Sequence, residues 1–113
     1  MGEHQEKLSY YKQLLPSSVR VEVHQEEDGS FWAKVLDFEN CLTQGKNFSD
    51  LLEMISEAIY VSLDIPEELH AFLPRYVPQE IKDELERKKW QDGFDKFISD
   101  QIRGKREFEF TSA

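Results

Sequence analysis

Two short runs of alternating apolar and polar residues flank an Asp28-Gly29 turn signal, and this arrangement constrains the fold most. One face of the first run carries three valines: Val19, Val21 and Val23. Alternation with a period of two predicts half-buried strands. A glycine at a tight turn adopts positive φ without steric cost. The sequence therefore predicts an antiparallel hairpin over residues 19–38.

The second run of this hairpin is apolar on both sides. One side carries Phe31, Ala33 and Val35, and the other carries Trp32, Leu36 and Phe38. A strand that is apolar on both faces indicates a sheet covered on both faces. We therefore expect the N-terminal helix, the C-terminal tail or a second chain to cover the second face, and we expect a homodimer.

Helical periodicity appears on both sides of the hairpin. Residues 3–15 have apolar positions at helical spacing, and a wider stripe follows Ser49, which can cap a helix. That stripe is formed by Leu51, Leu52, Ile55, Ala58 and Ile59. Its width indicates either burial on two sides within the chain or an interface, and we favour burial within the chain.

The second half of the chain is rich in helix signals and proline. A short helix is expected over residues 66–73 and a longer one over 79–89. The apolar stripe that begins at Trp90 is half a turn out of phase with the stripe before it, so we expect a bend near residues 91–93. Alternating Phe and Glu predict a last strand over residues 106–111.

These segments together predict an α+β fold, in which an antiparallel sheet of three or four strands has helices packed on it. At 113 residues the chain is expected to form a single domain. Its core would span residues 19–63, between an N-terminal helix and a helical C-terminal extension over 64–113 that ends in a strand.

The net charge of −9 is unevenly distributed along the chain. Residues 1–78 contain 6 Lys/Arg and 14 Asp/Glu, a net charge of −8, and residues 79–113 contain 8 and 9, a net charge of −1. Non-specific binding of nucleic acid needs a basic face, so we do not expect it. The acidic surface could serve solubility alone, or it could meet a basic protein.

Side chains typical of catalytic or metal sites are sparse. The three histidines lack metal-ligand spacing, no Gly-rich phosphate loop occurs, and Cys41 is the only cysteine. We therefore expect a non-enzymatic protein without a cofactor, in which Cys41 is buried. A single cysteine allows no intrachain disulfide, and no apolar run has membrane-spanning length. The cytoplasm is the expected compartment.

Two alternatives involve nucleic acid. Glu22 and Asp37 could lie on neighbouring strands as a carboxylate pair, as in a small metal-dependent nuclease on an RNase H-like sheet. Short basic clusters at residues 87–89 and 103–106 are mixed with carboxylates, and solvated faces explain them more simply than nucleic-acid contacts do.

The segment from residue 19 to residue 63 resembles the HicB-type antitoxin domain. That family typically shows Asp-Gly-x-aromatic, then Pro-Asp-Leu-Pro-Gly-Cys, Thr-x-Gly and a Glu-Ala-rich helix. This chain matches the pattern at Asp28, Gly29, Asp37, Cys41, Thr43, Gly45 and the Glu57-Ala58 step. It departs at Leu36 and Glu39, where the pattern has proline, and at Asn40, where it has glycine.

The resemblance implies a partial RNase H-like fold without its catalytic carboxylates, and it implies a function. A HicB-like antitoxin would bind a small basic HicA-type toxin, an mRNA-cleaving protein, and block its active site. The acidic residues expected to attract this partner are Glu26, Glu27 and Asp28 at the hairpin tip, and Asp37 and Glu39 before Cys41. The alternative is a stand-alone HicB-like scaffold or dimeric domain with another partner.

Family members usually also bind DNA through a ribbon-helix-helix or helix-turn-helix tail. Residues 79–102 lack helix-turn-helix spacing, and the tail lacks the strand-helix-helix order of the other motif. DNA binding is therefore not expected of this chain.

Overall fold

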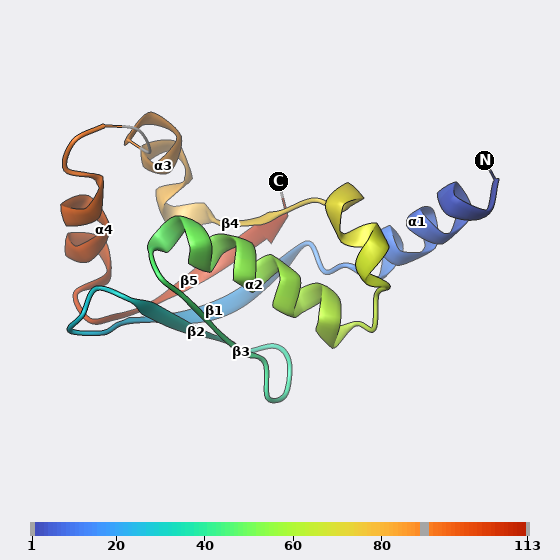
Figure 1. Ribbon diagram of the computed structural model, residues 1–113, viewed down its shortest axis with the longest axis horizontal. Helices are drawn as coiled ribbons and strands as arrows, with labels where there is room; N and C mark the ends of the chain where they lie inside the picture. Colours follow the sequence, from blue (N-terminus) through green and yellow to red (C-terminus); the bar gives the residue numbers. More distant parts are fainter. Residues whose placement is uncertain (1, 89–90, 113) are drawn as a thin grey trace.

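The structure is a computed structural model that describes residues 2–88 and 91–112, and it confirms an α+β fold with an antiparallel sheet and packed helices (Figure 1). In chain order the elements are α1 (Gly2–Leu14), β1 (Ser18–Gln25), β2 (Phe31–Val35), β3 (Leu42–Gly45), α2 (Phe48–Ser62), the 3₁₀ helix η1 (Glu67–Phe72), β4 (Tyr76–Pro78), the 3₁₀ helix η2 (Gln79–Ile81), α3 (Lys82–Lys88), α4 (Phe94–Ile102) and β5 (Lys105–Ser112). Trp90, where the second expected apolar stripe begins, lies outside the described residues, whereas Phe94, Phe97 and Ile98 of that stripe lie on α4.

The sheet has five antiparallel strands in the order β3-β2-β1-β5-β4, one more than the largest number predicted. The central strand β1 pairs with β2 and β5, so Val21 lies opposite both Val35 and Phe108. The additional strand is β4. A period-two pattern does not reveal it, because it has only three residues and ends in Pro78. Its position at a sheet edge is where proline is tolerated.

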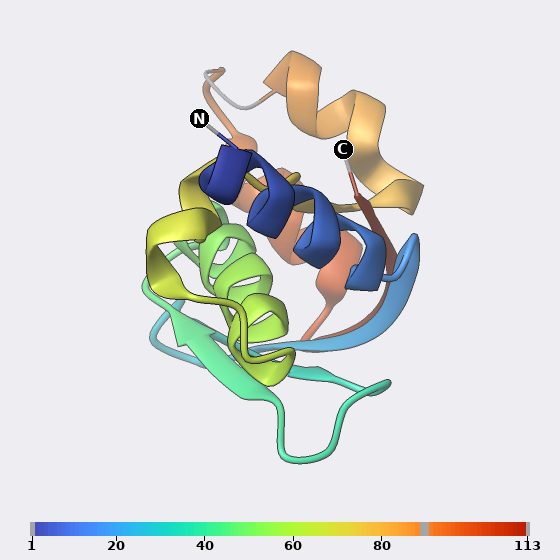
Figure 2. The ribbon, with the colours of Figure 1, turned by 90° about the vertical axis from the view of Figure 1, so that its right-hand side faces the viewer.

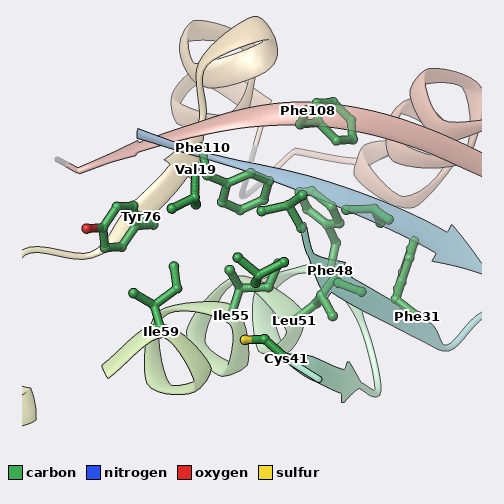
Figure 3. Packing of buried hydrophobic residues seen from close by; sticks show 14 of the residues in the cluster. Val19, Phe31, Cys41, Phe48, Leu51, Ile55, Ile59, Tyr76, Phe108 and Phe110 are labelled. Atoms are coloured by element: carbon green, nitrogen blue, oxygen red, sulfur yellow. The ribbon is translucent and has the colours of Figure 1, made fainter. Parts of the chain in front are cut away.

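The hydrophobic core lies between one face of the sheet and α2, as Figure 3 shows. The alternate residues of β1 predicted to share a face are all buried, and so are the inward residues of β2 and the inward phenylalanines of β5, Phe108 and Phe110. The α2 side chains that meet them are fully buried: Leu51, Ile55 and Ile59. Burial of these large apolar side chains is the main stabilising contribution of the fold.

Asn47, rather than the predicted Ser49, caps the N-terminus of α2. The Asn47 side chain accepts a hydrogen bond from the Asp50 backbone N–H at 2.8 Å, and the Asp50 carboxylate accepts one from the Lys46 N–H at 3.0 Å. These reciprocal bonds satisfy N–H groups at the helix start. A second side of α2 is buried against η1 and β4 through Tyr60 and Ser56, so the wide stripe is mainly covered within the chain.

Across the described ranges, neither the N-terminal helix nor the C-terminal helices cover the second face of the sheet (Figure 2), and its cover by a second chain stays a prediction. Within the described residues, the helices gather on one side of the curved sheet in Figure 2. This face of β2 is also less apolar than predicted, because β2 ends at Val35 and Leu36 and Phe38 lie beyond it. Only Trp32 and the exposed Lys34 belong to that face of β2.

The C-terminal extension follows the predicted order. Helical segments occupy 67–72 and 79–88, the bend occurs before Phe94 with Gly93 at φ +88°, and β5 forms the last strand. Positive φ favours glycine at that bend. None of the helices within the described ranges is both long enough and apolar enough to cross a membrane.

Candidate protein-binding surfaces

The hairpin tip between β1 and β2 is built by Asp28 and Gly29. The Asp28 carboxylate accepts hydrogen bonds from the backbone N–H and the hydroxyl of Ser30, at 2.9 and 2.6 Å. The Ser30 hydroxyl, followed by its N–H, holds the pKa of Asp28 below its usual value. Gly29 adopts φ +89°, as expected of this turn. Asp28 therefore has a structural role, whereas Glu26 and Glu27 are exposed carboxylates that can meet a partner.

Asp37 and Glu39 lie in the loop between β2 and β3. One oxygen of Asp37 accepts a hydrogen bond from the Arg20 backbone N–H at 2.8 Å, and the Leu36 N–H donates to the Arg20 carbonyl at 2.8 Å. These bonds hold the start of the loop against β1. Both Asp37 and Glu39 are exposed.

The structure thus divides the five acidic residues predicted to bind a partner into two groups. The hairpin tip and the β2–β3 loop lie at opposite ends of β2. At about 3.3 Å per residue, roughly 20 Å separates them. A single small contact cannot include both groups, so each must be tested separately.

A cleft of about 570 Å³ lies beside Asp37, and sequence reasoning does not find it. Apolar side chains from α1, the β2–β3 loop and the end of α2 line it: Leu14, Phe38 and Leu63. Charged residues at its margin are Arg20, Asp37 and Glu109. These residues come from five separate segments, so no sequence spacing could bring them together.

The uncovered sheet face carries a network of ion pairs around an aromatic stack. Glu22 and Glu107 lie directly opposite each other on β1 and β5, an arrangement that destabilises unless it is compensated. Arg20 donates to Glu107 at 2.6 Å, and His24 donates to Glu22 at 2.6 Å. The Trp32 ring stacks on His24 with centroids 3.7 Å apart.

Glu22, one half of the proposed nuclease pair, belongs to this network. The hydrogen bond from His24 holds the pKa of Glu22 below its usual value, and Lys105 at 3.6 Å adds to the effect. Asp37, the other half, contacts Arg20 instead. Across the part of the chain that is described, no group of three or more His, Cys, Asp or Glu side chains could hold a metal ion.

A second polar cluster joins η1 to α2. His70 is buried, and its Nδ1 forms a hydrogen bond with Glu57 while its Nε2 lies 2.9 Å from the Ile65 carbonyl oxygen. Arg75 contacts the other oxygen of Glu57 at 3.3 Å. His70 thus has a structural role, because it joins η1 to α2 from a buried position. The buried Cys41 thiol, 3.4 Å from the Ser62 hydroxyl, is in the environment predicted for it.

Comparison with protein-family models, with curated proteins and with solved structures finds no match to this chain.

Proposed function

We propose that this chain is a non-catalytic, HicB-like antitoxin that binds a small basic HicA-like toxin and inhibits its mRNA cleavage. The proposal rests on the HicB-like pattern of residues 19–63. The residues of that pattern have specific structural roles: Gly29 forms the hairpin turn, Cys41 is buried and Gly45 packs against α2.

The proposed basic character of the partner rests on the exposed carboxylates at both ends of β2. These carboxylates belong to residues 1–78, which have a net charge of −8. Opposite charge accelerates association and selects against acidic partners. A small basic ribonuclease fits this surface. We place the complex in the cytoplasm, where the single thiol would remain reduced and where mRNA is available.

Co-purification with a basic toxin encoded in the same operon tests this function. The untagged chain should be retained by the tagged toxin, and should abolish RNA cleavage at a one-to-one ratio. Absence of binding even at low salt would contradict the proposal.

The chain alone is the necessary control for nuclease activity. We expect no hydrolysis of RNA or DNA with or without Mg²⁺. Turnover that disappears in Asp37→Asn or Glu22→Gln would instead establish the nuclease hypothesis.

We also propose that the chain is a homodimer, joined through the edge strand β3. Within the described chain, no strand pairs with the outer edge of β3, whose Leu42 is 60% exposed. Beside this edge lies a shallow groove of about 480 Å³ that includes Trp32, Leu42 and Met54. Two copies of an edge strand can pair antiparallel across a two-fold axis. If no toxin binds, this dimer supports the scaffold alternative.

A further inference from the structure

We propose that the cleft beside Asp37 receives an arginine or lysine side chain of the basic partner, carried on an apolar segment. This inference rests on the proposed function and identifies the contact through which the partner docks. Three features of the cleft support it: its apolar floor, its acidic margin and its place at the end of α2.

The floor suits the aliphatic stem of a long basic side chain. Phe38 and Leu63 are partly buried against the core, and Leu14 is 42% exposed on the facing end of α1. Lysine and arginine pack their methylene groups along such surfaces while the charged head stays near water. An aromatic ring such as Phe38 adds attraction for a cation near its face.

The margin has an excess of negative charge. Arg20 is the cation there, and it already donates to Glu107 at 2.6 Å, outside the cleft. Arg20 also lies directly opposite Glu109 in the β1–β5 register, so the exposed carboxylates Asp37 and Glu109 exceed the single cation of the margin by one negative charge. One Asp37 oxygen accepts the Arg20 N–H, which fixes the side chain in position.

The end of α2 provides the third feature. Leu63 is the C-cap residue of α2. All residues of α2 are described, and its last turn contains no basic residue. The partial negative charge at a helix C-terminus favours a cation. The helix end and the two carboxylates therefore attract the same kind of group.

Titration with acetyl-leucyl-arginine amide, followed by amide chemical shifts, tests the cleft without the toxin. The shifts should saturate and concentrate around Leu14, Phe38 and Leu63. An otherwise identical peptide with uncharged citrulline should bind about fivefold more weakly. Equal shifts from both peptides, or shifts elsewhere, would overturn the inference.

Two double variants each remove two negative charges, one variant at the cleft and the other at the hairpin tip. Asp37→Asn with Glu109→Gln should weaken arginine-peptide binding about fivefold, whereas Glu26→Gln with Glu27→Gln should leave it unchanged. Asn keeps an oxygen to accept the Arg20 N–H. If the cleft variant does not fold, Leu14→Ser on α1 should produce the same loss. Equal affinity in wild type and cleft variant would reject the inference.

The toxin separates failure of this inference from failure of the proposed function. If the toxin binds wild type and cleft variant equally well, the cleft is wrong and the antitoxin function stands. If the arginine peptide binds the cleft and the toxin binds neither protein, the antitoxin function is wrong and the cleft belongs to another basic partner.

Discussion

Gly45 of β3 lies against the backbone of Leu51 in α2, so closely that a Cβ atom on Gly45 would be 2.5 Å from the Leu51 nitrogen and 2.7 Å from its Cα. Backbone atoms cannot move away as a flexible side chain can. Gly45→Ala should therefore destabilise the protein by about 1–3 kcal/mol, measured by urea unfolding. Gln44→Ala, at the exposed neighbouring position, is the control. Equal stability of Gly45→Ala and wild type would mean that α2 can move away from the sheet.

Two buried tyrosines predict a loss of stability at alkaline pH. Burial raises the pKa of Tyr76 to about 12 and raises that of Tyr60. The folded protein thus favours the neutral phenol. The resulting stabilisation is complete below pH ~10, where an unfolded tyrosine titrates, and is lost as the pH rises through about 12.

Tyr76→Phe should remove the contribution of the Tyr76 phenol to the pH dependence of the unfolding free energy. The Tyr76 hydroxyl donates to the Pro16 carbonyl at 2.5 Å, so the variant should lose about 1 kcal/mol at neutral pH. Its unfolding free energy should then fall less steeply than that of wild type between pH ~10 and ~12. Urea titrations at several pH values measure both effects, and parallel curves for the two proteins would count against this assignment.

Charge reversal at the hairpin tip should slow association with a basic toxin. Glu26→Lys with Glu27→Lys is the appropriate change, because Asp28 holds the turn through Ser30 and should be kept. Each exposed charge contributes about 1 kcal/mol or less, so the on-rate should fall several-fold and its salt dependence should weaken. Stopped-flow mixing measures both.

The control for this reversal is Glu67→Lys with Glu68→Lys on η1, which changes the net charge equally at another exposed site. It should slow association less. An equal effect of the two variants would show that net charge, rather than the tip, attracts the partner.

The proposed dimer predicts a light-scattering mass of twice 13.4 kDa at tens of micromolar. Leu42→Arg should make the protein monomeric, because it places a charge at the β3 edge. Val61→Arg, at a 64% exposed site on α2, is the matched control and should leave the dimer intact. A monomeric wild type would reject the dimer.

The acidic character and the main elements could be predicted from the sequence, because they depend on neighbouring residues. Alternation defines β1 and β5, Asp28-Gly29 defines the hairpin turn, and helical spacing defines α2. The Glu22 and Asp37 environments could not be predicted in this way. Glu22 contacts Lys105, and Asp37 is held by the Arg20 backbone and faces Glu109 across a cleft.

Only the tertiary structure decided which acidic residues lie together and which face of the sheet is open. β5 returns from the far end of the chain to pair with β1, which brings residues 105–109 beside residues 20–24. Such pairing depends on long-range packing, and short-range periodicity does not encode it. The same is true of the cleft, whose walls are segments up to 95 residues apart, from Leu14 to Glu109. Local patterns determine what each segment becomes, and burial of the shared core determines which segments meet.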